Sequence, residues 1–148
     1  MGKETPEIPY EACNKQGKVF ALANRLGNDL KEYATRYMQS EFVMQGKDND
    51  YAYYQIAAPS YSLDLVDDDE LHGNQPGVGG VSNDEAYWIG FFYKYFGFAL
   101  SLRSDKVVER VPFEKMRSLY ADFGNLPKEE ARDKLLQILK GRSYNEWE

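Results

Sequence analysis

The chain has 148 residues, of which 43% are hydrophobic and 15% aromatic, and its formal net charge is −6. This length and composition fit one globular domain with a substantial core and exclude an intrinsically disordered chain. The single cysteine excludes an internal disulfide, and the polar first residues do not have the form of a signal peptide, so we expect a cytoplasmic protein.

The negative charge is concentrated in the first half of the chain. Residues 1–80 carry 7 basic and 13 acidic side chains, whereas residues 81–148 carry 11 of each. Nucleic acid is an unfavourable partner for such a chain, because neutralisation of phosphates supplies most non-specific affinity. We expect the partner to be another protein, of basic character.

Residues 1–12 are expected to form a loose N-terminal arm, and residues 13–141 a single helical domain. Apolar side chains recur at steps of three and four between Lys18 and Met44, which predicts an amphipathic helix. Gly27 interrupts this pattern, so two helices that meet near Ser40 are the alternative. The apolar stripe consists of Val19, Leu22, Leu26, Leu30, Tyr33, Tyr37 and Met38.

The middle of the chain gives weaker signals. Residues 51–71 are compatible with a strand or with helix, and we favour helix. Residues 73–80 contain four glycines and one proline, so a flexible glycine-rich loop is expected over 73–81.

A strong helix signal follows this loop. Ser82 and Glu85 have the spacing of a capping box, in which each side chain binds the backbone N–H of the other residue. The next 17 residues are apolar on nearly every face, which predicts a central aromatic helix over 84–102 that other helices surround. A membrane span is disfavoured, because it needs about 20 predominantly apolar residues and Lys94 interrupts this run.

Three shorter elements are expected after this helix. Ser104 is the predicted N-cap of a short turn that ends near Val108, and Pro112 the predicted first residue of a helix over 113–120. A last helix begins at Pro127 and ends at Gly141, before a polar tail at 142–148. The side chains expected to face inward from this helix are Ala131, Leu135, Ile138 and Leu139.

The predicted fold class is therefore mainly α. We expect a compact orthogonal or irregular bundle of about five to seven helices around the central aromatic helix.

The sequence contains no recognisable catalytic or metal-binding motif. His72, the only histidine, lies at the start of the glycine-rich loop, where a catalytic base would be poorly held, and one histidine cannot complete the usual zinc sets. The glycines at 77–80 do not predict a phosphate loop, because Asp84 and Glu85 would repel the anion. No catalytic residue, cofactor or metal is therefore expected.

The acidic run Asp67, Asp68, Asp69 and Glu70 is a candidate partner-binding segment. Adjacent acids point in different directions, whereas calcium loops alternate ligands with non-ligands. We therefore expect a solvated acidic loop that a basic protein could contact.

The central helix supplies a second candidate. Eight aromatic residues fall within residues 87–98, more than one helix usually buries in so small a domain. Some should then contribute to a partner surface or to a homodimer interface. The candidates are Tyr87, Trp88 and Tyr95.

Part of the chain resembles a family of small, uncharacterised bacterial helical proteins that are described as antitoxin-like from their gene neighbourhoods. The resemblance covers roughly Asn83 to Leu139. The residues that carry it are Glu85-Ala86-Tyr87-Trp88-Ile89-Gly90, Tyr93-Lys94-Tyr95, Ser104, Met116-Arg117-Ser118-Leu119-Tyr120 and the helix after Pro127. It implies a non-enzymatic binding protein that neutralises or scaffolds a partner, and it implies no active-site residue.

Two other functions remain open. A nucleic-acid-binding regulator would use the locally basic stretch between Arg103 and Arg117. An enzyme would need an unfamiliar site built from carboxylates and tyrosines.

Overall fold

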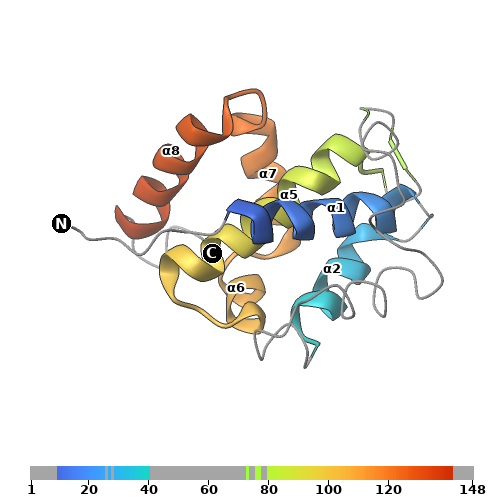
Figure 1. Ribbon diagram of the computed structural model, residues 1–148, viewed down its shortest axis with the longest axis horizontal. Coiled ribbons are helices and arrows are strands. Elements are labelled where there is room, and N and C mark those ends of the chain that lie inside the picture. The colour runs from blue at the N-terminus through green and yellow to red at the C-terminus, as the bar shows by residue number, and fades with distance from the viewer. Residues whose placement is uncertain are drawn as a thin grey trace.

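A computed structural model describes residues 10–25, 27, 29–40, 73, 76–77 and 80–141 of the chain, with the side chains of residues 140 and 141 left out. These residues form six helices and no strand, which confirms the mainly α bundle (Figure 1). The helices are α1 (Tyr10–Arg25), α2 (Leu30–Met38), α5 (Asn83–Leu100), α6 (Ser104–Arg110), α7 (Phe113–Phe123) and α8 (Lys128–Gly141).

The bundle is organised around α5, and α1 is the helix that packs most extensively against it. In Figure 1, α1 lies across α5, while α2 and α8 lie at opposite ends of the view. Most residues of α5 between Glu85 and Phe96 are buried, as the apolar pattern predicts for a helix surrounded by others. This confirms the predicted central aromatic helix.

The contact between α1 and α5 is close because glycine lies at the crossing on both helices. A Cβ atom on Gly17 would lie 2.8 Å from the Tyr87 ring, and one on Gly90 would lie 2.7 Å from the backbone oxygen of Gln16. The buried amide of Gln16 also donates a hydrogen bond from Nε2 to the Gly90 carbonyl over 2.9 Å. Two glycines and one amide therefore fix the position of α1 on α5.

The boundaries of the first two helices differ from the sequence prediction. The chain is already helical at Tyr10, within the predicted arm, and α1 ends at Arg25 rather than continuing toward Met44. Gly27 adopts φ +94°, a left-handed conformation that ends a helix. Asp29 then caps α2 by accepting a hydrogen bond from the backbone N–H of Lys31. The first helix therefore ends at Arg25 and the second begins after Asp29, while the predicted junction near Ser40 falls at the edge of the described residues, where α2 ends at Met38.

Two predicted helix starts are shifted by one residue. Ser104 is the first residue of α6, not its N-cap, because its hydroxyl donates to the carbonyl of Met38 (2.6 Å) and so ties α6 to α2. Pro112 is the N-cap of α7 rather than its first residue. In α8, Ala131, Leu135 and Leu139 are buried as predicted, whereas Ile138 is only half-buried.

The N-terminus of α5 shows half of the predicted capping box. The Ser82 hydroxyl accepts a hydrogen bond from the backbone N–H of Glu85. The Glu85 carboxylate forms a bidentate ion pair with Arg117 of α7, over 2.8 and 3.2 Å, instead of returning to Ser82. Arg117 also donates to the carbonyl of Gly80 (3.1 Å), and Asn24 donates to that of Val81 (2.9 Å). These bonds join the end of the glycine-rich loop to α1, α5 and α7.

Replacing Ser82 with alanine is expected to lower the free energy of unfolding by about 1 kcal/mol, because the N–H of Glu85 loses its acceptor. Urea denaturation followed by circular dichroism measures this loss. Ser82→Asp keeps an acceptor at the cap and serves as the control. A Ser82→Ala protein as stable as the wild type would show that the cap contributes nothing.

Among the helices of the described residues, none combines the length and apolar character needed to cross a membrane.

Candidate functional site

The structure separates the predicted partner-binding residues into two groups. Asp67, Asp68, Asp69 and Glu70, like His72 and the whole segment 51–71, lie outside the described residues. Tyr87, Trp88 and Tyr95 are described, and they are only 9%, 5% and 4% exposed. Their rings belong to the core, so the aromatic partner surface expected on α5 is not formed by these three side chains.

The end of α5 does expose an aromatic ring. Phe98 is 44% exposed, and with Tyr10 it is one of two exposed large hydrophobic side chains among the described residues. Three partly buried apolar side chains, Ala99, Leu100 and Leu102, lie beside it in the chain where α5 turns into α6. The turn is made by Ser101 in a left-handed conformation (φ +55°), which caps α5. We call these four apolar residues the α5–α6 corner.

A different arrangement lies between α5 and α8. Tyr87, Phe91 and Tyr95 are four residues apart, so they share one face of α5. Lys128 and Arg132 have the same spacing on α8 and lie over that face. The Lys128 ammonium lies 5.0 Å from the Tyr87 ring centre and 5.5 Å from that of Phe91, and the Arg132 guanidinium lies 5.9 Å from that of Tyr95. We call these five residues the cation–aromatic cluster.

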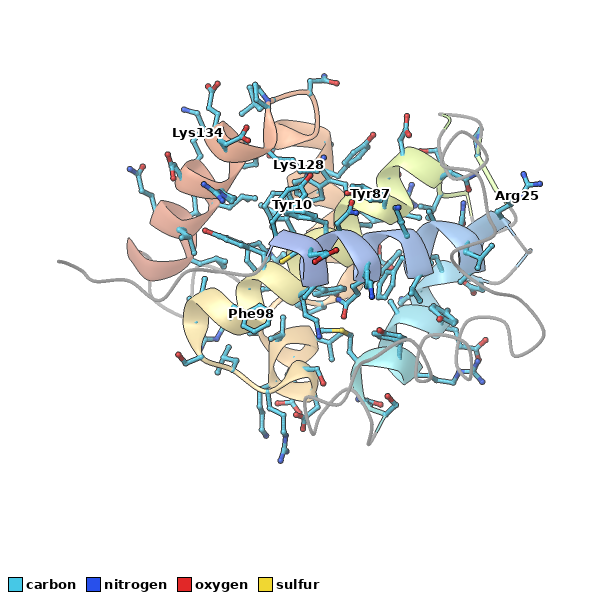
Figure 2. All side chains as sticks on the ribbon, viewed as in Figure 1. Tyr10, Arg25, Tyr87, Phe98, Lys128 and Lys134 are labelled. Atoms are coloured by element: carbon cyan, nitrogen blue, oxygen red, sulfur yellow. The ribbon has the colours of Figure 1, made fainter. Side chains whose placement is uncertain are left out.

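The first turns of α1 border this cluster. Tyr10 packs its ring edge-on against Phe91, with ring centres 5.3 Å apart, and the Tyr87 hydroxyl donates to the side chain of Asn14. Figure 2 shows Tyr10, Tyr87 and Lys128 converging between α1 and α8. Since Tyr10 is 54% exposed, the cluster reaches the surface at this point.

Two titratable groups with shifted pKa values lie next to the cluster. Burial raises the pKa of the Cys13 thiol to about 11, although the positive charges of Lys94 and Arg132 act in the opposite direction. Burial also lowers the pKa of Lys94 to about 8. The thiol is therefore neutral near pH 7, and it lacks the thiolate character of a reactive cysteine. Because the charges of Lys94 and Arg132 both act on the Cys13 thiol, the three side chains lie in the same region of the protein.

Lys94 is expected to titrate near pH 8 in the folded protein and near 10.5 in the unfolded chain. Between these values the unfolded chain holds the proton and the folded one does not. The contribution of Lys94 to stability therefore rises with pH across this window. A pH titration of the Lys94 Cε resonance by NMR measures the midpoint, with the urea-unfolded chain as the control. A folded-state midpoint near 10.5 would contradict the expectation.

The basic stretch between Arg103 and Arg117 is extensively paired with acids. Arg103 pairs with Asp105 (2.5 Å) and Lys106 with Glu109 (3.6 Å), while Arg117 is held by Glu85. The remaining two basic side chains, Arg110 and Lys115, also have interaction partners. This arrangement favours a mixed-charge helical surface over a phosphate-binding face.

The described residues contain no group of three or more His, Cys, Asp and Glu side chains able to hold a metal ion. The start of α5 does not present free donors to a phosphate. The Asp84 carboxylate there accepts from the backbone N–H of Gly73 (3.0 Å), and Ser82 already accepts from that of Glu85.

Sequence reasoning did not find the two α8 cations. The sequence suggested no role for Lys128 or Arg132, although their four-residue spacing matches that of Tyr87, Phe91 and Tyr95. The matched spacing could have suggested that the two sets face each other. It could not have shown that the side chains of Lys128 and Arg132 lie over this face of α5.

Comparison of this chain with protein-family models, curated proteins and solved structures gave no match.

Proposed function

We propose that this chain is a non-enzymatic protein-interaction module that binds a basic protein through the α5–α6 corner. The observation that supports this proposal is the 44% exposure of the Phe98 ring, which lies 5.9 Å from the Lys94 ammonium and next in the chain to three apolar residues packed against the core. Large rings at the centre of an apolar patch supply much of the binding energy in protein interfaces. The resemblance to antitoxin-like proteins, which covers residues 83–139, supports the same class of function.

Charge supports a basic partner. The net charge of −6 steers a positively charged protein toward this chain at long range, whereas burial of Phe98 supplies short-range affinity. Within this proposal the acidic run Asp67, Asp68, Asp69 and Glu70 contributes to steering. Reversal of these four charges to lysine should therefore slow association more than it accelerates dissociation.

The test is an affinity capture from the host lysate with the tagged protein, its Phe98→Ser variant and its Tyr10→Ser variant. Tyr10 is the matched control, because it is also an exposed ring but lies at the start of α1, away from the corner (Figure 2). We expect one stoichiometric basic protein that Phe98→Ser loses and Tyr10→Ser retains. Binding of the purified partner should then weaken about tenfold or more in Phe98→Ser, which is a loss of about 1.4 kcal/mol.

Two outcomes would contradict the proposal. The first is capture of the partner equally by all three proteins. The second is a homodimer of the chain, measured by light scattering, that Phe98→Ser dissociates, because a second copy would then occupy the corner.

A further inference from the structure

The cation–aromatic cluster holds two positive charges that have no acceptor in the described part of the chain. The Nε atom of Arg132 is buried without a hydrogen-bond partner. The Lys128 ammonium lies over the rings of Tyr87 and Phe91, and among the described residues neither Lys128 nor Arg132 forms an ion pair with a carboxylate. A buried guanidinium N–H without an acceptor costs free energy, which an added acceptor would recover.

The two cations are placed to act together. Lys128 and Arg132 lie one turn apart on α8, so both side chains project toward the same face of α5. The charges of Lys94 and Arg132 both act on the Cys13 thiol, and the Lys94 ammonium itself lies 5.9 Å from the centre of the Phe98 ring. The acids beside the two cations in the chain, Glu129, Glu130 and Asp133, are exposed on α8.

We propose that the cation–aromatic cluster is a binding site for an oxyanion, a carboxylate or a phosphate group, carried by a ligand. The guanidinium of Arg132 matches the two-oxygen edge of such a group, and the ammonium of Lys128 supplies a point charge beside it. Tyr10, which is 54% exposed and packs against Phe91, marks the place where the cluster meets the surface. The exposed Tyr10 ring then lies against the rest of the ligand. The residues of this site differ from those of the α5–α6 corner, and its test does not depend on the basic partner proposed for that corner.

The experiment uses the full-length protein and two probes, inorganic phosphate and acetate, each at constant ionic strength set with sodium chloride. The Nε–H resonance of Arg132 is followed by NMR during each titration. We expect a saturable shift with a dissociation constant in the millimolar range for one of the probes. Saturation with phosphate alone assigns a phosphate-bearing ligand, and saturation with acetate alone assigns a carboxylate.

Variants separate a site from a general charge effect. Lys128→Gln should weaken binding about tenfold or more, as read from the Arg132 resonance. Arg132→Gln should do the same, as read from the backbone resonances of Tyr10. Lys134→Gln removes an equal charge from the exposed outer side of the same helix (Figure 2) and should leave binding unchanged. If circular dichroism shows that Arg132→Gln does not fold, the affinity of Lys128→Gln for the probe tests the proposal by itself.

Three results would overturn the proposal. They are shifts that stay linear up to high probe concentration, shifts that chloride alone reproduces, and equal losses of affinity in Lys134→Gln and Lys128→Gln.

Discussion

Replacing Gly90 with alanine is expected to lower the free energy of unfolding by about 2–4 kcal/mol. The new methyl carbon would lie 2.7 Å from the backbone oxygen of Gln16 and 2.8 Å from the Phe20 ring. Neither neighbour can move away cheaply, because one is backbone and the other is a buried ring. The helices must separate, and the hydrogen bond from Gln16 to the Gly90 carbonyl is strained or lost. The gain of about 1 kcal/mol in helix propensity does not offset this cost.

Urea denaturation of the purified variant measures the effect, and Gly97→Ala is the matched control in the same helix. A Cβ atom on Gly97 would approach the Leu102 carbonyl only to 3.3 Å. We therefore expect Gly97→Ala to remain within about 1 kcal/mol of the wild type. Equal stability of Gly90→Ala and Gly97→Ala would show that α1 and α5 are not in close contact at Gly90.

Replacing Phe20 with alanine is expected to lower the free energy of unfolding by about 3–5 kcal/mol. This ring is fully buried and packs edge-on against Tyr33 and Tyr37 of α2 and Tyr93 of α5, with ring centres 5.3–6.4 Å apart. Its loss leaves a cavity where three helices meet, and large tyrosine rings cannot easily collapse into it. A domain of this size is stable by about 5–15 kcal/mol, so the variant can be partly unfolded at 37 °C.

Thermal unfolding followed by circular dichroism measures this loss. Phe98→Ala is the control, because it removes the same ring from an exposed position. It should change the free energy of unfolding by no more than about 1 kcal/mol. A small effect at both positions would mean that Phe20 does not lie in the core.

Local signals in the sequence predicted the helices of the second half well. Ser82 as N-cap, the dense apolar run after it and the inward positions Ala131, Leu135 and Leu139 of α8 all agree with the structure. Each of these features depends on spacing within one helix, so it can be read without knowledge of the fold.

The predictions that failed depended on contacts between helices. Serine is a common N-cap residue, but in the structure the Ser104 hydroxyl donates to the Met38 carbonyl of α2. The Glu85 carboxylate does not complete the capping box, because it forms a bidentate ion pair with Arg117 of α7. Tyr87 and Tyr95, expected at a partner surface, lie instead beneath Lys128 and Arg132 of α8. The exposed surfaces of the protein therefore could not be predicted from the sequence alone, because they depend on which helices pack against each other.

The pairing of α1 with α5 has a consequence for synthesis of the protein. The buried bond from Gln16 to Gly90 joins residues 74 positions apart, and α1 finds its main partner only when α5 has been made. At about 5–20 residues per second, the ribosome needs roughly 4–15 s to add that length of chain. During this interval Phe20 of α1 can already contact Tyr33 and Tyr37 of α2, but the part of α1 that packs against α5 has no helix to cover it. We expect the nascent chain to be a chaperone substrate until α5 leaves the ribosome.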